Sequence, residues 1–478
     1  MPQGVVIEDG KLVDTDPATG KEIARIPITT AAELNQIIAK AKEAQVSWSL
    51  KPLEARGSLL KEACKKLEAS KDKLQETIIK EMGKIQNEAL EEVEGAIDKD
   101  AWIDLVIDAN KPVVLDEGKS IVCRQPHGVV GLCTPWNFPA DEILLLALPA
   151  LIAGNTVIVK PSEVTPLTGA IVLQALIDTL PDGVANLVQG DGTVGEALVN
   201  HADVNMVGMT GSLATGQKIM QACSNGLKRL VLELGGKDPM VVFSDADLDK
   251  AADDAVMFSV MNCGQVCCAV ERIYVDSKIK DAFEKKVVEK ASTLKVGPGT
   301  DIENNVGPMV SDLQRKKVQE HVDDALKNGA KELFKSAIPA TPGNWFPVTV
   351  LTDLKQDMQI QREETFGPVV AIASFDGTDE TAVKLSNDTE YGLSASVYSK
   401  DLERATRVSQ LIKAGQVGVN AYPMLTANVS CPWIGQKGSG FGYHSGPDGW
   451  RQFSVPQSIV SQEKLQIQPP MKSSGYPQ

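Results

Sequence analysis

Short apolar runs that alternate with helical stretches are the feature that most constrains the fold of this chain. Beyond Gly128, each run is followed by a turn and then by residues with helical periodicity. Strands and helices that alternate in this way form a parallel sheet covered on both faces. We therefore predict two α/β units. The first has strands at Val129–Cys133, Thr156–Val159 and Val204–Met209, and the second, after Leu230, at Pro239–Phe243, Arg272–Val275, Val369–Phe375 and Ser394–Tyr398.

The residues before these strands have a different pattern. From Thr30 to Val106, apolar residues recur at three and four positions among Lys and Glu, which predicts an amphipathic helical layer. A chain of 478 residues with 43% hydrophobic content should contain two to four domains. Pro- and Gly-containing joints near Pro112 and Gly236–Pro239 are the predicted boundaries. The longest apolar run, Ile143–Gly154, is too short to span a bilayer and predicts a buried helix.

Composition excludes several classes of partner. A net charge of −15 argues against nucleic acid and anionic membranes, because both are bound through basic patches, and it favours a small molecule. The eight cysteines lack the spacing of a disulfide framework or a zinc site, so we expect reduced thiols, no metal and a cytoplasmic location. Residues 1–20 lack the apolar core of a signal peptide, and the tail from Gln468 is expected to be loose.

The segment Asn262–Ala269 is the strongest candidate for chemistry. It places Cys267 in a loop of small residues after the apolar helical run Ala255–Met261. A thiol in such a loop can act as a nucleophile. A single cysteine is more often a small buried hydrophobe, and we interpret the neighbouring Cys268 in that way.

A carboxylate about thirty residues upstream could serve as its partner. Glu233 lies between Leu232 and Leu234 and is followed by two glycines, Gly235 and Gly236. An apolar setting raises the pKa of a carboxyl group towards neutrality, which suits a general base.

A proline-braced loop, Thr134–Pro139, supplies a further candidate. It contains Trp136 and Asn137. When a thiolate adds to an aldehyde, the carbonyl oxygen becomes an alkoxide. A fixed side-chain N–H, such as that of Asn137, can stabilise this charge together with the backbone N–H of the nucleophile. The alternative is that the asparagine only holds the loop in shape.

Three more segments have polar or glycine-rich turns next to predicted strands. Thr210–Gly216 follows a strand and opens a helix, an arrangement that can receive a pyrophosphate, although a simple turn and helix cap explains it equally well. Lys160 and Glu163 end a strand and can bond ribose hydroxyls or form an ordinary surface ion pair. Glu363–Pro368 contains two glutamates before an aromatic residue and, taken alone, reads as a solvated turn.

These six segments, in this order from Pro135 to Pro368, resemble the NAD(P)-dependent aldehyde dehydrogenase superfamily. The resemblance implies a nucleophile at Cys267, a general base at Glu233 and an oxyanion donor at Asn137. It also implies a set of cofactor-binding residues, namely Trp136, Lys160, Glu163, Gly211, Ser212, Gly216, Glu364 and Phe366.

The fold implied by the resemblance is α/β with three parts. A Rossmann-like cofactor domain is expected at residues 1–109 and 126–235, and an α/β catalytic domain at 236–430. A small β oligomerisation element is expected at 110–125 with 454–467. Such an element implies a homodimer or a homotetramer.

The implied reaction is oxidation of an aldehyde to a carboxylic acid through a cysteine thiohemiacetal and a thioester, which Glu233 helps to hydrolyse. NAD is the expected cofactor, because Glu163 would repel the 2′-phosphate of NADP, but NADP stays open. Two alternatives also stay open. One is a semialdehyde dehydrogenase, either of the succinic-semialdehyde type or acylating coenzyme A, and the other is a non-catalytic scaffold of the same fold.

The sequence departs from the family at the expected proton path. Many hydrolytic members have a lysine where this chain has Leu146, and a relay carboxylate where it has Tyr443-His444. The helix expected to line the substrate tunnel begins with Asp141 and Glu142 and has no arginine. We therefore expect neutral or cationic aldehydes to be preferred over ω-carboxylates, unless both acidic residues pair with the helical layer. Arg451 is the first candidate for a cationic anchor.

Overall fold

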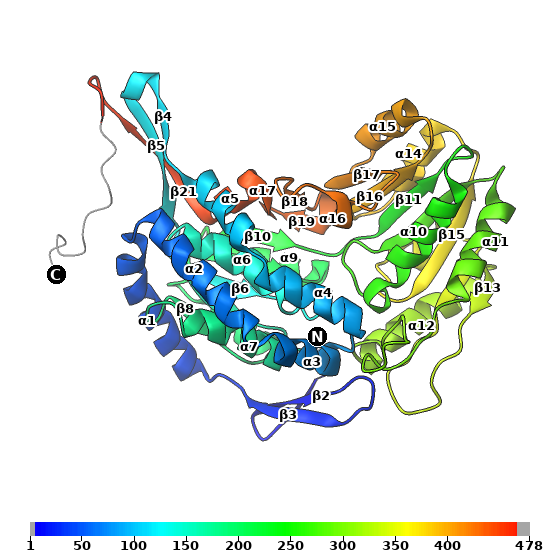
Figure 1. Cartoon of the computed structure of the whole chain (residues 1–478), viewed down its shortest axis with the longest axis horizontal. Helices are drawn as coiled ribbons and strands as arrows, with labels where there is room; N and C mark the ends of the chain where they lie inside the picture. The colour runs from blue at the N-terminus through cyan, green and yellow to red at the C-terminus, as the bar shows by residue number, and fades with distance from the viewer. Residues whose placement is uncertain (1–4, 466–478) are drawn as a thin grey trace.

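Two α/β lobes lie side by side, and a β arm projects from one of them (Figure 1). The computed structural model describes residues 5–465. The C-terminal part of the chain passes along one edge of both lobes, so that segments distant in sequence meet between them. This arrangement positions the candidate site.

The first lobe is built on a six-stranded sheet of order β19-β10-β9-β6-β7-β8. Its strands are parallel except for the short edge strand β19. The predicted runs all form strands here, because their continuously apolar side chains are buried on both faces of the sheet. The bounds are β6 Val129–Cys133, β7 Thr156–Lys160, β8 Ala185–Leu187, β9 Met206–Thr210, β10 Arg229–Glu233 and β19 Gly440–Phe441.

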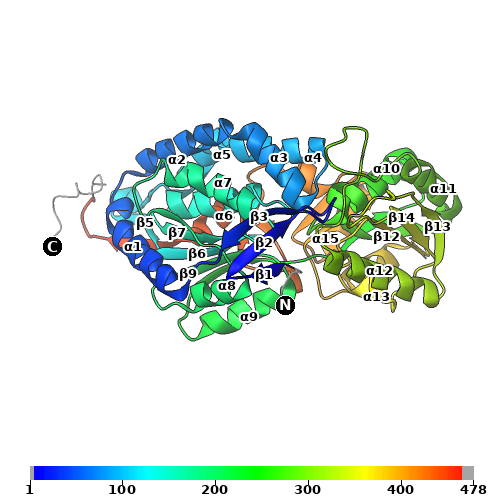
Figure 2. The same ribbon diagram turned by 90° about the horizontal axis from the view of Figure 1, so that it is seen from below.

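Helices cover both faces of this sheet, as Figure 2 shows with α2 and α5 on one side and α8 and α9 on the other. The predicted helical layer between Thr30 and Val106 is present, and Thr30 begins it with a reciprocal capping box to Glu33. The helices are α1 Ala31–Ser49, α2 Leu53–Glu68, α3 Lys71–Met82, α4 Gln86–Ile97, α5 Asp100–Asn110, α6 Asp141–Ile152, α7 Pro166–Ile177, α8 Gly192–Asn200 and α9 Leu213–Ser224.

The second lobe is built on a seven-stranded sheet of order β13-β14-β15-β12-β11-β16-β17. Only the edge strand β13 is antiparallel. Its strands are β11 Asp238–Val242, β12 Val270–Asp276, β13 Lys331–Lys335, β14 Thr349–Thr352, β15 Val369–Phe375, β16 Ser394–Tyr398 and β17 Gln416–Val419. Its helices are α10 Leu248–Val260, η2 Met261–Gly264, α11 Lys280–Ala291, α12 Asp312–Lys327, α13 Gln359–Arg362, α14 Asp379–Asn387, α15 Leu402–Leu411 and α16 Pro423–Thr426. The largest hydrophobic core surrounds this sheet.

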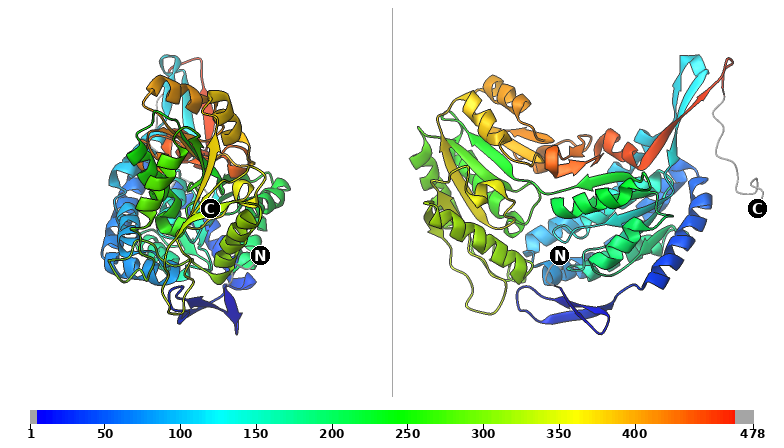
Figure 3. Two further views of the ribbon diagram at one scale, coloured as in Figure 1. Left: turned by 90° about the vertical axis from the view of Figure 1, so that its right-hand side faces the viewer. Right: turned by 180° about the vertical axis from the view of Figure 1, so that it is seen from behind.

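The arm is a three-stranded antiparallel sheet of order β21-β5-β4. Strands β4 (Val113–Leu115) and β5 (Ser120–Pro126) are joined by the turn η1 (Asp116–Gly118), and β21 (Ser454–Val460) pairs along the whole length of β5. Figure 3 shows the arm standing clear of the body. The part of the predicted element beyond Leu465, and the predicted loose tail, lie outside the described residues.

Two features were not expected from the sequence. Residues read as polar and turn-rich form a small antiparallel sheet of β1 (Val6–Glu8), β2 (Lys11–Thr15) and β3 (Glu22–Pro27). A second feature lies between the arm and the second lobe, where the chain returns to the first lobe. It comprises β18 Trp433–Ile434, η3 Lys437–Ser439, β19, β20 Tyr443–His444, α17 Gly446–Trp450 and η4 Arg451–Phe453. Because β19 pairs with β10, this return brings Trp433 near the end of β10.

Candidate active site

The loop before Cys267 is a tight turn. Asn262, Cys263 and Gly264 all have positive φ, at 52°, 56° and 69°. A Cβ on Gly264 would collide with the carbonyl of Gly367, so only glycine permits this approach. The side chain of Asn262 donates to the carbonyls of Asn137 and Gln265, each at 3.1 Å. These bonds tie the cysteine loop to the loop that contains Asn137.

The carboxyl end of β10 approaches this turn closely. A Cβ on Gly236 would collide with the carbonyl oxygen of Cys267, and one on Gly235 would collide with the carboxylate of Glu364. The two glycines that follow Glu233 therefore let the nucleophile loop and the Glu364 turn pack against the end of the strand.

Glu233 and Cys267 meet at this point. Glu233 is 3% exposed and lies next to the Cys267 thiol, while the indole N–H of Trp433 donates to its Oε1 at 3.0 Å. Its Oε2 has no hydrogen-bond partner among the described residues. Burial raises the pKa of Glu233 to about 7. The hydrogen bond from Trp433 and the nearby Cys267 thiol partly offset this rise. The carboxyl is thus poised to take and release a proton near neutral pH.

The two adjacent cysteines have different surroundings. Cys268 is 1% exposed, and the hydroxyl of Tyr422 donates to its carbonyl at 2.8 Å and lies 3.2 Å from its Sγ. Cys267 keeps part of its surface. A hydrogen bond from Cys268, followed by burial and the charge of Glu233, raises the pKa of Cys267 well above its usual value. The thiol form of Cys267 is therefore favoured at rest, and its proton has to leave before the sulfur can attack.

Asn137 lies in the loop between β6 and α6 and is 6% exposed. The loop is braced from the helical layer. The ammonium of Lys84 stands 3.7 Å from the centre of the Phe138 ring and 2.7 Å from Glu92, and Glu92 accepts from the backbone N–H of Ala140 at 2.8 Å. A side chain fixed in this way costs little to reorganise when it binds a developing charge.

The two acidic residues at the start of α6 point in different directions. Asp141 pairs with Lys99 of the helical layer at 2.6 Å, as the alternative interpretation expected. Glu142 does not pair with that layer. It accepts a hydrogen bond from the hydroxyl of Thr210 at 2.9 Å, at the end of β9. Burial, followed by the charge of Glu233, raises the pKa of Glu142 well above its usual value.

The turn between β9 and α9 packs closely against the end of β10. Ser212 caps α9 by accepting from the N–H of Thr215 at 3.3 Å, and its own surface is exposed. A Cβ on Gly216 would lie 2.7 Å from the side chain of Leu234, so glycine lets the helix pack on the strand end. Gly211 donates its N–H to the carbonyl of Glu233 at 3.0 Å.

Lys160 and Glu163 lie at the carboxyl end of β7, on the same edge of the sheet. Their ion pair is 3.1 Å long, and Lys160 also donates to the carbonyl of Pro161 at 3.0 Å. The two residues therefore form an ion pair, as one of the two interpretations of the sequence expected. Their position beside the β9–α9 turn is also compatible with binding a ribose. A row of polar groups and an open helix N-terminus on the carboxyl edge of a parallel sheet fits a dinucleotide.

Glu364 and Phe366 complete this edge from the second lobe. Glu364 accepts from the N–H of Gly236 at 3.1 Å, and the Phe366 ring packs edge-on against Trp136 with centroids 5.4 Å apart. Glu271 holds the turn by accepting from the N–H groups of Thr365 and Phe366, both at 2.8 Å. The solvated turn that this segment suggests in isolation is thus an ordered part of the interface between the lobes.

The residues where the sequence departs from the expected proton path carry no charge close to neutral pH, or are used elsewhere. Leu146 is packed in the core of the first lobe. His444 is buried, its Nδ1 lies 2.9 Å from the hydroxyl of Ser445, and burial lowers its pKa to about 4. Arg451 donates to the carbonyl of Ala109 at 2.9 Å, at the end of α5, so its guanidinium is used at the base of the arm.

The sequence identified most of the residues that gather here but missed two. Trp433 lies in the returning C-terminal segment, and no local pattern marks it as a partner of Glu233. Thr210 was noted only as the first residue of a turn. Among the described residues, 5–465, no cluster of His, Cys, Asp or Glu is arranged to hold a metal ion.

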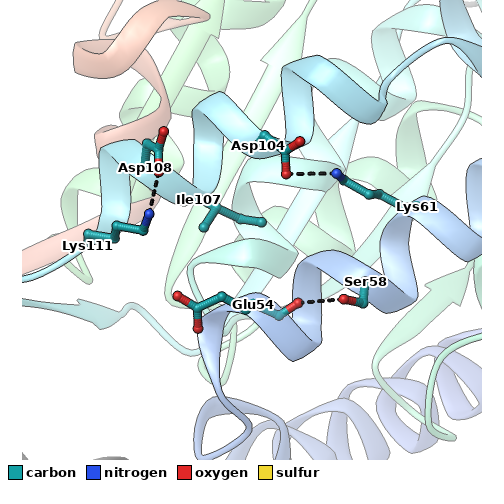
Figure 4. A pocket seen from close by; sticks show the side chains of 7 residues that line it. All are labelled: Glu54, Ser58, Lys61, Asp104, Ile107, Asp108 and Lys111. Atoms are coloured by element: carbon teal, nitrogen blue, oxygen red, sulfur yellow. Dashed lines mark hydrogen bonds and ion pairs between the residues drawn. The ribbon is translucent and has the colours of Figure 1, made fainter.

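A separate surface cleft of about 350 Å³ lies between α2 and α5 (Figure 4). Two ion pairs lie in it, Lys61 with Asp104 at 2.7 Å and Lys111 with Asp108 at 2.6 Å. Neither Cys267 nor Glu233 lines it, and it has no part in the chemistry described above.

Comparisons with known proteins agree with this geometry. Residues 7–459 match the model of the aldehyde dehydrogenase family. A protein of Sinorhizobium fredii named probable succinate-semialdehyde dehydrogenase [NADP(+)] is 37% identical over 448 residues, 92% of this chain and 90% of that protein.

Solved structures show the same likeness. Lactaldehyde dehydrogenase from Escherichia coli superposes with a TM-score of 0.91 at 32% identity, covering 96% of this chain and 97% of that one. A mutant of aldehyde dehydrogenase C from Pseudomonas syringae, solved with NAD⁺ and octanal, gives a TM-score of 0.90 at 31% identity, covering 97% and 98%.

The match of fold and sequence over nearly the whole chain places it among the enzymes that oxidise aldehydes with NAD(P). This chain belongs to the aldehyde dehydrogenase family and is an NAD(P)-dependent enzyme of that family.

Proposed function

We propose that the enzyme converts an aldehyde to a carboxylic acid, with Cys267 as nucleophile and Glu233 as base. The thiol of Cys267 releases its proton to solvent, and its sulfur bonds to the aldehyde carbon. The oxygen becomes an alkoxide that the Asn137 side chain and the Cys267 N–H stabilise. NAD(P), when bound, accepts the hydride of the aldehyde carbon. Glu233 then deprotonates a water that attacks the thioester, and the carbon–sulfur bond breaks.

The contact of Glu233 with Cys267 is the observation that carries this proposal. The Cys267→Ala variant should lose aldehyde oxidation by ~10⁴-fold or more while retaining cofactor binding, because the covalent step has no other thiol. The matched variant Cys268→Ala should keep most of the activity, because its thiol is enclosed beside Tyr422. Steady-state NADH formation and cofactor fluorescence titration measure both quantities. The reverse pattern would move the nucleophile to Cys268.

The cofactor is proposed to lie along the carboxyl edge of the six-stranded sheet. Lys160 and Glu163 would hold the adenosine ribose, and the turn with Gly211, Ser212 and Gly216 the pyrophosphate. Glu364 would hold the nicotinamide ribose, with Phe366 and Trp136 beside the ring. The negative charge of Glu163 favours NAD over NADP. Glu163→Ser should lower the ratio of kcat/KM with NAD to kcat/KM with NADP. A wild-type preference for NADP would contradict this assignment.

The aldehyde itself is less constrained. Asp141 is neutralised by Lys99, and burial favours the neutral form of Glu142, which weakens the charge argument against ω-carboxylate substrates. Succinic semialdehyde is the second candidate because a relative at 37% identity bears that name. Comparing kcat/KM for succinic semialdehyde, a neutral aldehyde of similar length and an aminoaldehyde decides between them. A clear preference for succinic semialdehyde would require a cationic anchor other than α6.

Glu233 also bears on the fate of the thioester. A buried base next to the nucleophile supports hydrolysis, whereas transfer to coenzyme A needs no water activated at this point. The free acid should therefore form at the same rate with and without coenzyme A, as product analysis by mass spectrometry can measure. The non-catalytic alternative is disfavoured by the intact set of Cys267, Glu233 and Asn137.

The domain roles and assembly follow the same proposal. Residues 1–109 with 126–235 would bind cofactor, 236–430 would carry the nucleophile, and 110–125 with 454–467 would form contacts between subunits of a homodimer or homotetramer. No helix within residues 5–465 is long and apolar enough to cross a membrane. All eight cysteines are free, which supports the proposed cytoplasmic location.

A further inference from the structure

Hydrolysis leaves a proton on Glu233 in a confined place. Its Oε1 is held by Trp433, and Leu146 occupies the position where many relatives have a lysine. Its Oε2 faces no hydrogen-bond partner among the described residues. For the base to act again, this proton has to move to a neighbouring group.

Glu142 is the ionisable group that the fold brings to this position. Glu233 is the register partner of Thr210 on the parallel strands β10 and β9. Side chains of register partners point to the same face of a sheet and lie about 5 Å apart. The Thr210 hydroxyl in turn donates to Glu142 at 2.9 Å. A hydroxyl can accept one proton while it gives up another, so it can connect the two carboxyls.

The two residues differ in exposure in the direction that proton release to solvent requires. Glu233 is almost fully enclosed, whereas Glu142 is half-buried. The other charged groups around Glu142 are committed elsewhere, because Asp141 pairs with Lys99 and Glu92 pairs with Lys84. Glu142 and Glu233 are thus two carboxyls without an ion pair beside Thr210, while Glu364 at the end of β10 is bound by the N–H of Gly236.

We propose that Glu142 relays protons for Glu233, and that the two carboxyls share one proton through the Thr210 hydroxyl at rest. The inference rests on the proposed role of Glu233. When Glu233 takes a proton from the hydrolytic water, the hydroxide oxygen bonds to the thioester carbon and the thiolate of Cys267 leaves. The pair then holds two protons. Glu142 releases its proton to solvent and receives that of Glu233 through Thr210, which ends unchanged.

The relay is tested in full-length enzyme with p-nitrophenyl acetate, which acylates Cys267 without requiring the cofactor. Glu142→Gln keeps the size and the hydrogen bond to Thr210 but cannot carry the proton. It should acylate normally, deacylate ~10- to 100-fold more slowly and accumulate acetyl-enzyme by intact mass spectrometry. Asp141→Asn, the adjacent acidic residue, is the matched control and should deacylate as the wild type does. Equal deacylation rates in Glu142→Gln and Asp141→Asn would overturn the proposal.

A second pair of variants separates relay from structural support. Thr210→Ser retains the hydroxyl and should deacylate close to the wild-type rate, whereas Thr210→Val should be slow. Small buffer acids and bases, such as formate and imidazole, should restore deacylation in Glu142→Gln, because they can carry the proton instead. Slow deacylation in Glu142→Gln that no buffer restores, with Thr210→Val unaffected, would overturn the relay. Failure of Glu233→Gln to accumulate acetyl-enzyme would instead contradict the proposed function.

Discussion

At the scale of the residue, the proposed role of Glu233 as base makes its protonation the step that controls turnover. Glu233→Gln should preserve a pre-steady-state burst of NADH but stop turnover at the thioester, because the amide cannot deprotonate water. Rapid-mixing absorbance at the NADH wavelength measures the burst. Loss of the burst together with turnover would show that Glu233 is needed to activate Cys267.

The pH dependence follows from the same group. Because burial raises the pKa of Glu233 to about 7, the base is protonated below that pH and the wild-type rate should rise through about pH 7. The Trp433 bond opposes this rise, so its removal in Trp433→Phe should raise the pKa further. A hydrogen bond of about 0.5–1.5 kcal/mol corresponds to a shift of the acidic limb by roughly 0.4–1.1 on the pH scale, towards alkaline pH. A limb that stays in place or moves to lower pH would contradict this role of Trp433.

At the scale of the element, a buried carboxyl pair joins the N-terminal sheet to the helical layer. Asp14 of β2 lies against Glu81 of α3, and Glu81 also accepts from the backbone of Leu167 and Thr168. Burial raises the pKa of Asp14 to about 6 and that of Glu81 well above its usual value. Since Asp14 releases its proton at lower pH in the unfolded chain, its contribution to stability is present in acid and is lost as the pH rises through about 6.

The Asp14→Asn variant tests this linkage. The amide keeps a donor towards Glu81 and removes the second charge, so the variant should gain stability relative to the wild type as the pH rises from 5 to 8. Thermal melts across this range should show a difference of about 1–2 °C at pH 8 and a smaller one at pH 5. Asp9→Asn, on the exposed turn between β1 and β2, is the control. If the difference in melting temperature between Asp14→Asn and the wild type became smaller as the pH rises, the raised pKa of Asp14 would be contradicted.

The sequence could predict features that depend on neighbouring residues, but not contacts between segments that are distant in the chain. The strands of both sheets followed from continuously apolar runs, and Cys267 and Glu233 from the small residues beside them. Trp433 could not be found, because its contact with Glu233 depends on the return of the chain to β10. The sequence also could not show which way the side chain of Glu142 points. Helix α6 is buried on nearly all sides, so no amphipathic pattern shows which way its first turn faces.

At the scale of the whole molecule, the arm is the feature that calls for a partner. It projects from the first lobe (Figure 3). Both of its outer strands carry exposed apolar side chains, namely Val113, Val114, Leu115, Ile459 and Val460. Strand edges with such residues are prone to pair with another chain unless charge or cover prevents it. A second copy of this chain, contacted through the arm, would cover these residues.

The assembly can be tested by placing charges on the arm. The double variant Val114→Lys with Val460→Lys should lower the mass of the oligomer measured by size-exclusion chromatography with light scattering, because two lysines would have to be desolvated in the interface. Leu402→Lys, at a residue 61% exposed on α15 and far from the arm in Figure 1, is the matched control and should leave the mass unchanged. A wild type that is monomeric at micromolar concentration, or a double variant with the mass of the wild type, would show that the arm does not hold subunits together.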